Sequence, residues 1–254
     1  KPLGYAGDYE MANQLLGDPR QGTNTYIQLV NATFLRAAVA VAHRNRIDIL
    51  VNFLKGAVAR AEKEGTVVRI LNIGCGPAAE IQRLLATGAD LSRLEVTLVD
   101  FSRETLDYAR SRIEEAESAH GQKVSVAYVH ESVHDLLKRG ARQSAAVVGA
   151  GFDYIYCAGL FDYLSDKVCS RLIRYFLSRC NPGARMLLTN VHSDNPERYG
   201  MEHLLEWHLI YRNEAQMESI MSDVASSIEL YTDPTGVNLF AEATIGTVPS
   251  VRAV

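Results

Sequence analysis

The spacing of apolar residues divides the chain into a helical N-terminal part and a longer part in which strands and helices alternate. Between Asn24 and Gly65, apolar residues recur every three or four positions, with Asn24 placed to cap a helix and Gly65 placed to end one. After Gly65 short β-branched runs take over, separated by stretches of helical periodicity. The pattern predicts a helical cap over residues 1–64 and an α/β domain over residues 65–254.

Several apolar runs in the second part are typical of strands that are buried on both faces of a sheet. They are Val67–Ile73, Glu95–Val99, Val124–Val129, Phe152–Cys157 and Arg185–Val191. The segments Ala79–Ala86, Arg103–Glu117 and Asp166–Ser178 have helical periodicity and lie between several of them. This alternation predicts βαβ units and a parallel sheet.

The C-terminal third departs from this alternation. Residues 181–184 (Asn-Pro-Gly-Ala) predict a turn, and roughly residues 197–223 predict a long helical insertion that acts as a lid. Two further strand-like runs, Ile228–Thr232 and Leu239–Ile245, flank the turn residues 233–236. They predict an antiparallel hairpin at the end of the sheet.

The composition of the chain disfavours several classes of binding partner. Among 254 residues, 47% are hydrophobic and 22% are charged, which is usual for a folded globular protein. The net charge of −4 disfavours nucleic acid as the main partner, and no apolar run is long enough for a membrane span. Four cysteines without metal-ligand spacing favour reduced thiols and a cytoplasmic location. The oligomeric state is left open.

A glycine turn between a buried strand and a helix marks the candidate ligand site. Gly74 and Gly76 follow the strand that ends at Ile73. Glycines allow a tight turn and a close approach of the backbone to a ligand, and the start of a helix offers unpaired N–H groups. Asp100 ends the next strand, 24 residues after Gly76, a spacing typical of a carboxylate that binds ribose hydroxyls. A generic βα turn with an ordinary strand-end aspartate is the alternative.

With these residues, the sequence resembles the class I S-adenosylmethionine-dependent methyltransferases over roughly residues 66–245. The resemblance implies a Rossmann-like seven-stranded sheet with an antiparallel last strand, and S-adenosylmethionine bound at Gly74, Gly76, Asp100 and the neighbouring Phe101. Asn72 stands where the family usually has an acid, and Ala78 stands where it usually has a third glycine. A dinucleotide-dependent dehydrogenase is the rival interpretation, which the predicted final hairpin disfavours.

The same resemblance implies further contacts at the ends of the third and fourth strands. The expected cofactor contacts there are Glu131, Ser132, Val133, Cys157, Ala158 and Gly159. The fourth strand runs on into Phe161, Asp162 and Tyr163. We expect this segment at the mouth of the pocket, with Phe161 as a substrate contact and Tyr163 as a catalytic residue.

The first nine residues carry two glycines and two tyrosines. They resemble the N-terminal segment of a bacterial group that includes 3-hydroxypalmitate methyl ester synthases. A glycine-flexible loop that carries Tyr5 and Tyr9 would close over a bound sulfonium, because an aromatic face attracts a cation. Tyr5 is therefore a candidate catalytic residue and Tyr9 a candidate substrate contact. A simple surface tether is the alternative.

The predicted helical insertion concentrates unusual residue types. His203, Trp207 and Tyr211 would share one helical face, and Trp207 is the only tryptophan of the chain. In methyltransferases of this kind such an insertion commonly covers the acceptor, which implies Trp207 and Tyr211 as substrate contacts and His203 as a catalytic base. Arg212 would clamp a carboxylate. An amphipathic lid helix that buries Trp207 only for packing is the alternative.

One apparent metal motif is rejected. Residues 130–134 spell His-Glu-Ser-Val-His, the zinc-protease pattern. That pattern needs a helix to bring both imidazoles to one face, whereas here it begins where a predicted strand ends. We therefore predict no metal site.

Three functions agree with these observations. The first is transfer of a methyl group from S-adenosylmethionine to a small molecule, with a carboxylate acceptor favoured because conspicuous acid/base pairs are lacking. The second is a cyclase that converts S-adenosylmethionine into azetidine-2-carboxylate and methylthioadenosine, suggested by the aromatic residues around the predicted methyl site and by Asn72 and Ala78. The third is a binding module without turnover.

Overall fold

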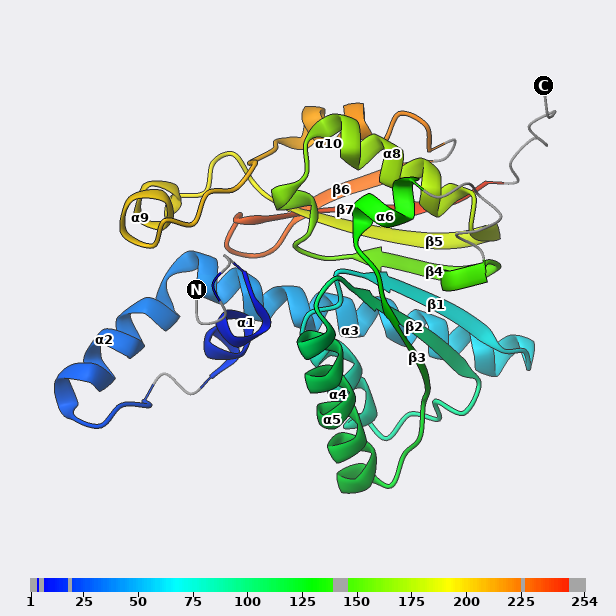
Figure 1. Ribbon diagram of the computed structural model, residues 1–254, viewed down its shortest axis with the longest axis horizontal. Coiled ribbons are helices and arrows are strands. Elements are labelled where there is room, and N and C mark those ends of the chain that lie inside the picture. Colours follow the sequence, from blue (N-terminus) through cyan, green and yellow to red (C-terminus); the bar gives the residue numbers. More distant parts are fainter. Residues whose placement is uncertain (1–3, 5–6, 18–19, 139–145, 225–226, 247–254) are drawn as a thin grey trace.

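The computed structural model describes residues 4, 7–17, 20–138, 146–224 and 227–246. Seven strands form one sheet in the order β3-β2-β1-β4-β5-β7-β6 (Figure 1). In chain order the strands are β1 Val68–Ile73, β2 Leu94–Asp100, β3 Ser125–His130, β4 Phe152–Cys157, β5 Cys180–Val191, β6 Ile228–Thr232 and β7 Asn238–Thr244. The first five pair in parallel, and β7 runs antiparallel to both β5 and β6. The parallel sheet and the final hairpin predicted from the sequence are confirmed.

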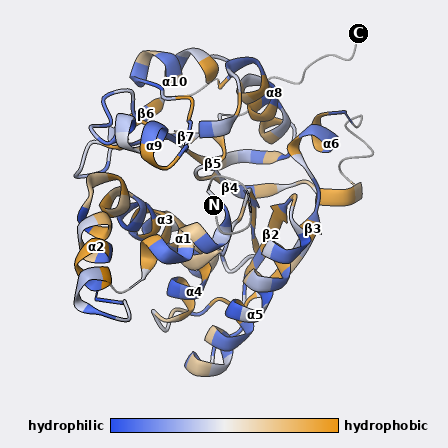
Figure 2. Cartoon of the chain, turned by 60° about the vertical axis from the view of Figure 1, so that its left-hand side comes forward, coloured by the Kyte–Doolittle hydropathy of each residue, from blue (hydrophilic) through white to orange (hydrophobic). Residues whose placement is uncertain are grey.

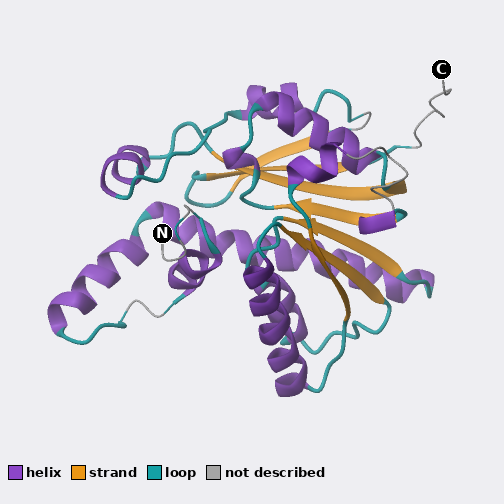
Figure 3. Cartoon of the chain, viewed as in Figure 1, coloured by secondary structure: helices purple, strands orange, loops and turns teal. Residues whose placement is uncertain are grey.

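Helices cover both faces of the sheet (Figures 1 and 3). They are α1 Tyr9–Leu16, α2 Thr25–Arg36, α3 Ala38–Glu64, α4 Ala79–Leu85, α5 Arg103–His120, α6 Val133–Lys138, the short 3₁₀ helix η1 Phe161–Tyr163, α8 Asp166–Leu177, α9 Arg198–Leu204 and α10 Glu214–Ile220. Buried residues of α3, α4 and α5 pack on one face of the sheet, and those of α8 and α10 pack on the other. Figure 2 shows hydrophilic and hydrophobic residues alternating along α5, α8 and α10.

The helix ends follow the local sequence. The Asn24 side chain accepts a hydrogen bond from the Ile27 N–H at the start of α2, as predicted. Gly65 ends α3 in the left-handed conformation with φ +67°, also as predicted. Helix α1 was not predicted; it is capped by Asp8, which accepts from the Met11 N–H at 2.8 Å.

Two predictions about the strands are wrong. Strand β3 lies at an edge of the sheet, so its residues are exposed or half-buried instead of buried on both faces. Residues 181–184 do not form a separate turn, because β5 already begins at Cys180, opposite Phe152. A register shift between β4 and β5 accommodates these residues, and Gly183 takes a φ of +78°.

The predicted long lid helix over 197–223 is also wrong. Helix α9 ends at Leu204, and α10 begins only at Glu214. Between them, Glu206 takes a left-handed φ of +49°, and Arg212 forms an isolated parallel bridge with His192 beside the end of β5. Residues 205–212, called the crossing segment below, therefore cover the sheet edge as extended chain.

No helix among the described residues is long and apolar enough by itself to span a membrane. Only α2 and α3 taken together would have the length and composition, and they are bent by 62° relative to each other.

Candidate functional site

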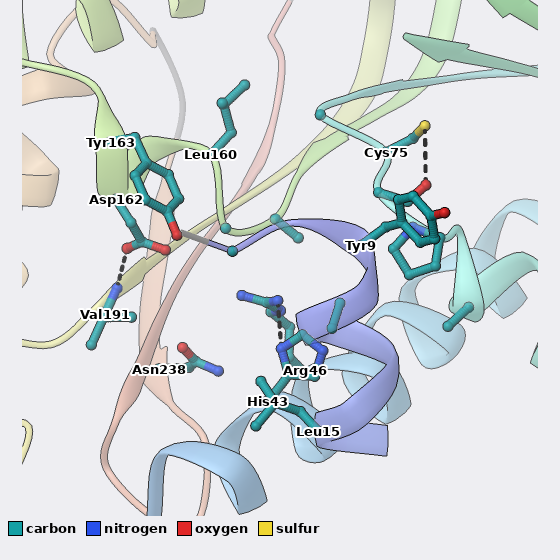
Figure 4. A pocket seen from close by; sticks show the side chains of 18 of the residues that line it. Tyr9, Leu15, His43, Arg46, Cys75, Leu160, Asp162, Tyr163, Val191 and Asn238 are labelled. Carbon is teal, nitrogen blue, oxygen red and sulfur yellow. Dashed lines mark hydrogen bonds between the residues drawn. The ribbon is translucent and has the colours of Figure 1, made fainter. Parts of the chain in front are cut away.

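A cavity of about 490 Å³ opens at the carboxyl ends of β1, β2 and β4. Its walls come from the glycine turn after β1, the segment after β4 and helices α1 and α3 (Figure 4), together with the crossing segment. The carboxyl edge of a parallel sheet is where α/β folds usually bind ligands. The sheet, the N-terminal helices and the crossing segment therefore enclose one site.

The glycine turn has the backbone geometry that the sequence predicts. Gly74 and Gly76 have φ values of +74° and +51°, which side chains disfavour. The Gly74 N–H donates to the Val99 carbonyl at 2.8 Å, and a Cβ at Gly74 would lie 3.2 Å from the Leu160 side chain. Glycine therefore lets the turn approach the segment that follows β4.

Ala78 explains one departure from the family pattern. It takes a left-handed conformation, with φ 50° and ψ 43°, at the start of α4. A non-glycine residue there costs about 1–2 kcal/mol. The turn thus keeps the backbone shape that a third glycine would allow, at the expense of local strain.

Asp100 lies at the end of β2 and lines the cavity. One carboxylate oxygen accepts from the Gly76 N–H at 3.2 Å, and the other accepts from the Ser102 N–H at 3.0 Å. Its side chain is buried, and this burial raises the pKa of the carboxyl. Phe101 follows it and also lines the cavity, but is 56% exposed. Asp100 thus ties the glycine turn to β2 and presents a carboxylate beside it.

A buried polar cluster lies beside the glycine turn. The Glu80 Oε1 atom accepts from the Tyr156 hydroxyl at 2.8 Å and from the Asn72 amide at 3.3 Å. All three residues line the cavity, and burial raises the pKa of Glu80. Among the described residues, none donates a hydrogen bond to Asn72 Oδ1. The cluster therefore offers a carboxylate and a free carbonyl-type acceptor.

Sequence reasoning missed Glu80. The available signal was Asn72 in place of the usual acid, with a carboxylate eight residues later on the first turn of the next helix. The structure brings these two side chains together, so the acidic character expected at the end of β1 comes from α4.

The segment after β4 forms the opposite wall of the cavity. Asp162 is buried, and its Oδ1 accepts from the Val191 N–H at 2.6 Å. Burial raises the pKa of Asp162 to about 6, against attraction by Arg46 and Arg212. Tyr163 accepts a hydrogen bond from the Trp207 indole N–H at 2.8 Å, which links this wall to the crossing segment. Burial also raises the pKa of Tyr163.

The N-terminal segment closes against the same tyrosine. Gly7 lies so near the Tyr163 hydroxyl that a Cβ there would clash with it. Tyr9 stacks on Tyr108 with ring centroids 4.5 Å apart and donates from its hydroxyl to Glu104 at 3.2 Å. These contacts hold α1 over the cavity, with Tyr9 in its lining.

Helix α3 contributes two residues that sequence reasoning did not single out. His43 and Arg46 lie one turn apart and both line the cavity. Arg46 Nη2 donates to His43 Nδ1 at 2.8 Å. Figure 4 shows the guanidinium between the imidazole and the Asp162–Tyr163 segment. Their periodicity on a long amphipathic helix gave no sign that they face a ligand site and not solvent.

The structure places about half of the sequence-predicted site residues at the cavity. Gly74, Gly76, Asp100, Phe101, Gly159, Tyr9, Tyr163 and Trp207 line it. Tyr5 lies outside the described residues. Gly159 is close to α3, because a Cβ on it would lie 2.9 Å from Arg46 Nη1.

Other predicted residues lie elsewhere. Cys157 and Phe161 are fully buried in the core beneath α8, and not in the cavity wall. Ser132 pairs with Asp135 through its hydroxyl, and neither it nor Val133 is in the cavity lining. These positions correct the contacts predicted at the strand ends.

The crossing segment separates the three residues that were predicted to share a helical face. His203 is exposed on α9 and stacks on Tyr199, with ring centroids 6.3 Å apart. Tyr211 packs under the Arg198 guanidinium, outside the cavity lining. Only Trp207 reaches the cavity, because the chain leaves the helical conformation at Leu205.

Arg212 is not available as a carboxylate clamp. Its guanidinium is buried and donates to the Phe161 and Leu164 carbonyls, Asn190 and Asp166. It therefore fixes the crossing segment to the segment after β4.

The zinc-protease pattern at residues 130–134 begins at the end of a strand. His130 ends β3, with its Nε2 atom 2.8 Å from the Phe101 carbonyl oxygen. Among the described residues no cluster of three potential metal ligands occurs.

The strand order, the antiparallel β7 and the site at the glycine turn define the class I methyltransferase fold. Residues 71–186 match the family model described as a methyltransferase domain. Residues 71–186 are thus similar to a methyltransferase domain, and the fold around them is that of the class I methyltransferases.

Solved structures agree on the fold. A protein from Bordetella parapertussis described as a possible exported protein is 18% identical with a TM-score of 0.68, over 96% of this chain and 81% of that one. Magnesium protoporphyrin IX methyltransferase from Synechocystis PCC 6803, with bound SAH, is 17% identical with a TM-score of 0.59, over 93% of each chain. The N-methyltransferase NodS from Bradyrhizobium japonicum WM9 is 15% identical with a TM-score of 0.53, over 94% of this chain and 98% of that one. No curated protein sequence matches the chain significantly.

Proposed function

We propose that the protein binds S-adenosylmethionine and transfers its methyl group to a small molecule held in the same cavity. The observation that carries this proposal is the continuity of the cavity. It extends from Asp100 and the glycine turn to Asp162, Tyr163 and Trp207, and the matched range 71–186 includes all of these except Trp207. A cavity of about 490 Å³ fits a small acceptor better than nucleic acid, in line with the net charge of −4.

The residues present fit the cofactor chemically. Asp100 would accept hydrogen bonds from ribose hydroxyls, next to the Gly76 backbone. The unpartnered Asn72 Oδ1 and the Glu80 carboxylate would hold a cationic group, because both are acceptors in a buried setting. Tyr9 and Tyr163 also line the cavity, where an aromatic ring would attract the cation.

When bound, S-adenosylmethionine would supply a methyl group already activated by its positive sulfur. The protein then has to align the acceptor and exclude water. Gly7 against Tyr163, and Trp207 hydrogen-bonded to Tyr163, join the N-terminal and crossing segments over the cavity. Asp162, with its pKa raised to about 6, would take the proton from a hydroxyl or amine acceptor. A carboxylate acceptor would need no base.

The direct test uses purified protein with S-adenosylmethionine labelled in the methyl group and a mixed set of small carboxylic acids, phenols and amines. We expect label in an organic product only when an acceptor is present. Failure of S-adenosylhomocysteine to bind, measured by calorimetry, would contradict the proposal.

A cyclase is the second candidate. The closed contact between the N-terminal segment and Tyr163 favours it, because an intramolecular displacement needs no entry for a second substrate. Incubation with S-adenosylmethionine alone separates the two. Release of methylthioadenosine with azetidine-2-carboxylate would support cyclisation, and absence of turnover until an acceptor is added would exclude it.

Trp207 provides an optical test of the cavity. It is the only tryptophan, lines the cavity and donates to Tyr163. We expect saturating S-adenosylhomocysteine to shift its emission to shorter wavelength, because the ligand replaces water beside the indole. Tyr163→Phe removes the acceptor and should change the emission of the unliganded protein. A spectrum insensitive to both changes would place Trp207 away from the site.

Asp162 should make stability depend on pH in an unusual direction. Its pKa rises from 3.8 to about 6 on folding, so between these values the folded state holds a proton that the unfolded state has lost. The stabilisation is complete below pH 3.8 and is lost as pH rises through 6. Relative to Asp162→Asn, the wild type should lose on the order of 3 kcal/mol between pH 4 and 7. If the free energy of unfolding of the two proteins changes by the same amount between pH 4 and 7, the assignment is contradicted.

The cytoplasmic location stays a prediction. It depends on the cysteine pattern, and the four cysteines are free thiols in the structure.

A further inference from the structure

The N-terminal half of α3 presents an unsatisfied donor to the cavity. Arg46 is always protonated and donates to His43 Nδ1, so the single proton of the neutral imidazole lies on Nε2. Burial, followed by nearby Arg46, lowers the pKa of His43, which keeps the ring neutral. In the described part of the chain nothing accepts from Nε2, which is shielded from solvent. A buried donor without an acceptor is unfavourable, and an anionic ligand would satisfy it.

The Arg46 guanidinium is also available to a ligand. No carboxylate among the described residues lies within ion-pair distance of it, although Asp162 and Glu80 attract it from farther away. Its Nη1 atom approaches Gly159, where a Cβ would lie 2.9 Å away. Glycine at this position therefore makes room for the guanidinium at the end of β4.

At the end of β1 the same cavity is lined by hydrogen-bond acceptors instead of donors. Asn72 Oδ1 lacks a donor, and Glu80 supplies a buried carboxylate. One part of the lining is thus suited to an anion, and the other to a cation. We propose that His43 and Arg46 form a carboxylate-binding site, in the part of the cavity opposite the acceptors Asn72 and Glu80.

This inference rests on the proposed function, which allows two sources of the carboxylate. One is the amino-acid end of S-adenosylmethionine, and the other is a carboxylate acceptor. Both require the same chemistry at Arg46, since a guanidinium binds a carboxylate through two parallel N–H donors.

Calorimetry with ligands that differ only in the carboxylate distinguishes the sources. S-adenosylhomocysteine carries it, and its decarboxylated analogue S-adenosyl-3-thiopropylamine lacks it. If the cofactor is the source, Arg46→Met should weaken S-adenosylhomocysteine binding by about 10- to 100-fold and leave the decarboxylated analogue unchanged. If the acceptor is the source, both affinities stay unchanged. Arg46→Met should then abolish butyrate binding to the protein saturated with S-adenosylhomocysteine, with butanamide as the neutral comparison.

Matched variants control for folding. Arg60→Met removes a guanidinium from the same helix, at a residue that pairs with Glu64 and Asp153 outside the cavity, and should change none of these affinities. Arg46→Lys keeps the charge but not the paired donors, and His43→Phe removes Nε2. Both substitutions should weaken binding of the carboxylate ligand that Arg46→Met affects, S-adenosylhomocysteine or butyrate, but to a smaller extent. They therefore test the site even if Arg46→Met fails to fold.

Two outcomes overturn the inference in distinguishable ways. If the wild type binds S-adenosylhomocysteine but the Arg46 and His43 variants discriminate carboxylate ligands as the wild type does, the carboxylate site is wrong and the proposed function stands. If the wild type binds neither S-adenosylhomocysteine nor its analogue, the proposed function fails and the inference fails with it.

Discussion

Replacing Arg212 with methionine should lower the free energy of unfolding by about 3–5 kcal/mol, because several buried acceptors would lose the donor that they share. The guanidinium is only 1% exposed. Its loss would leave the Phe161 and Leu164 carbonyls and the Asn190 side-chain oxygen without this donor, in a buried setting. Each such group costs about 1–3 kcal/mol. Urea denaturation at neutral pH measures the effect.

A surface arginine supplies the control for this prediction. Arg112 pairs with Glu115 on the exposed side of α5, and Arg112→Met should change the free energy of unfolding by less than about 1 kcal/mol. Equal effects of the two substitutions would mean that Arg212 does not anchor the crossing segment. Because that segment carries Trp207, we also expect Arg212→Met to alter tryptophan emission before global unfolding.

Replacing Asp100 with alanine should weaken S-adenosylhomocysteine binding by about 10- to 150-fold. The carboxylate would accept hydrogen bonds from the ribose, and a hydrogen bond to a charged group contributes roughly 1.5–3 kcal/mol. The substitution also removes the acceptor for the Gly76 and Ser102 N–H groups, which loosens the turn that would face the ligand. Calorimetric titration gives the affinity directly.

Asp90→Ala is the matched control for this substitution. Asp90 is an aspartate outside the cavity that accepts from the Ser92 N–H, so its loss should leave the affinity unchanged. Unaltered binding by a folded Asp100→Ala protein would show that the ribose contact has been assigned to the wrong residue.

Hydrophobic patterning was enough to predict the sheet, because its central strands are buried and their sequence runs are almost uninterrupted. Phe152–Cys157, a fully buried central strand, has the same bounds in prediction and structure. The edge strand Ile228–Thr232 also has the same bounds, although it is not fully buried. The pattern failed at 205–212, where apolar residues keep helical spacing although the chain is extended. There the tertiary contacts of Arg212 and the left-handed Glu206 decide the conformation, and neither can be recognised from local periodicity.

Some residues of the candidate site were likewise predictable from the sequence, and others depended on tertiary packing. Gly74, Gly76 and Asp100 were predictable because their chemistry depends on position at the ends of adjacent strands. Arg46 was not, because it reaches the cavity only once α3 has packed across the sheet. Phe161 was misplaced because side chains after β4 alternate between the cavity and the opposite core, and the sequence did not reveal which face each one takes.

Helix α3 carries both core residues and cavity residues over 27 positions of continuous helix. Leu54 and Phe53 pack against the sheet, and His43 and Arg46 lie two to three turns earlier. Removing one residue between them would rotate the N-terminal half by about 100° and shift it by about 1.5 Å. The imidazole and guanidinium would then leave the cavity together. The length of this stretch of helix should therefore tolerate no insertion or deletion, while substitutions on its solvent side remain free.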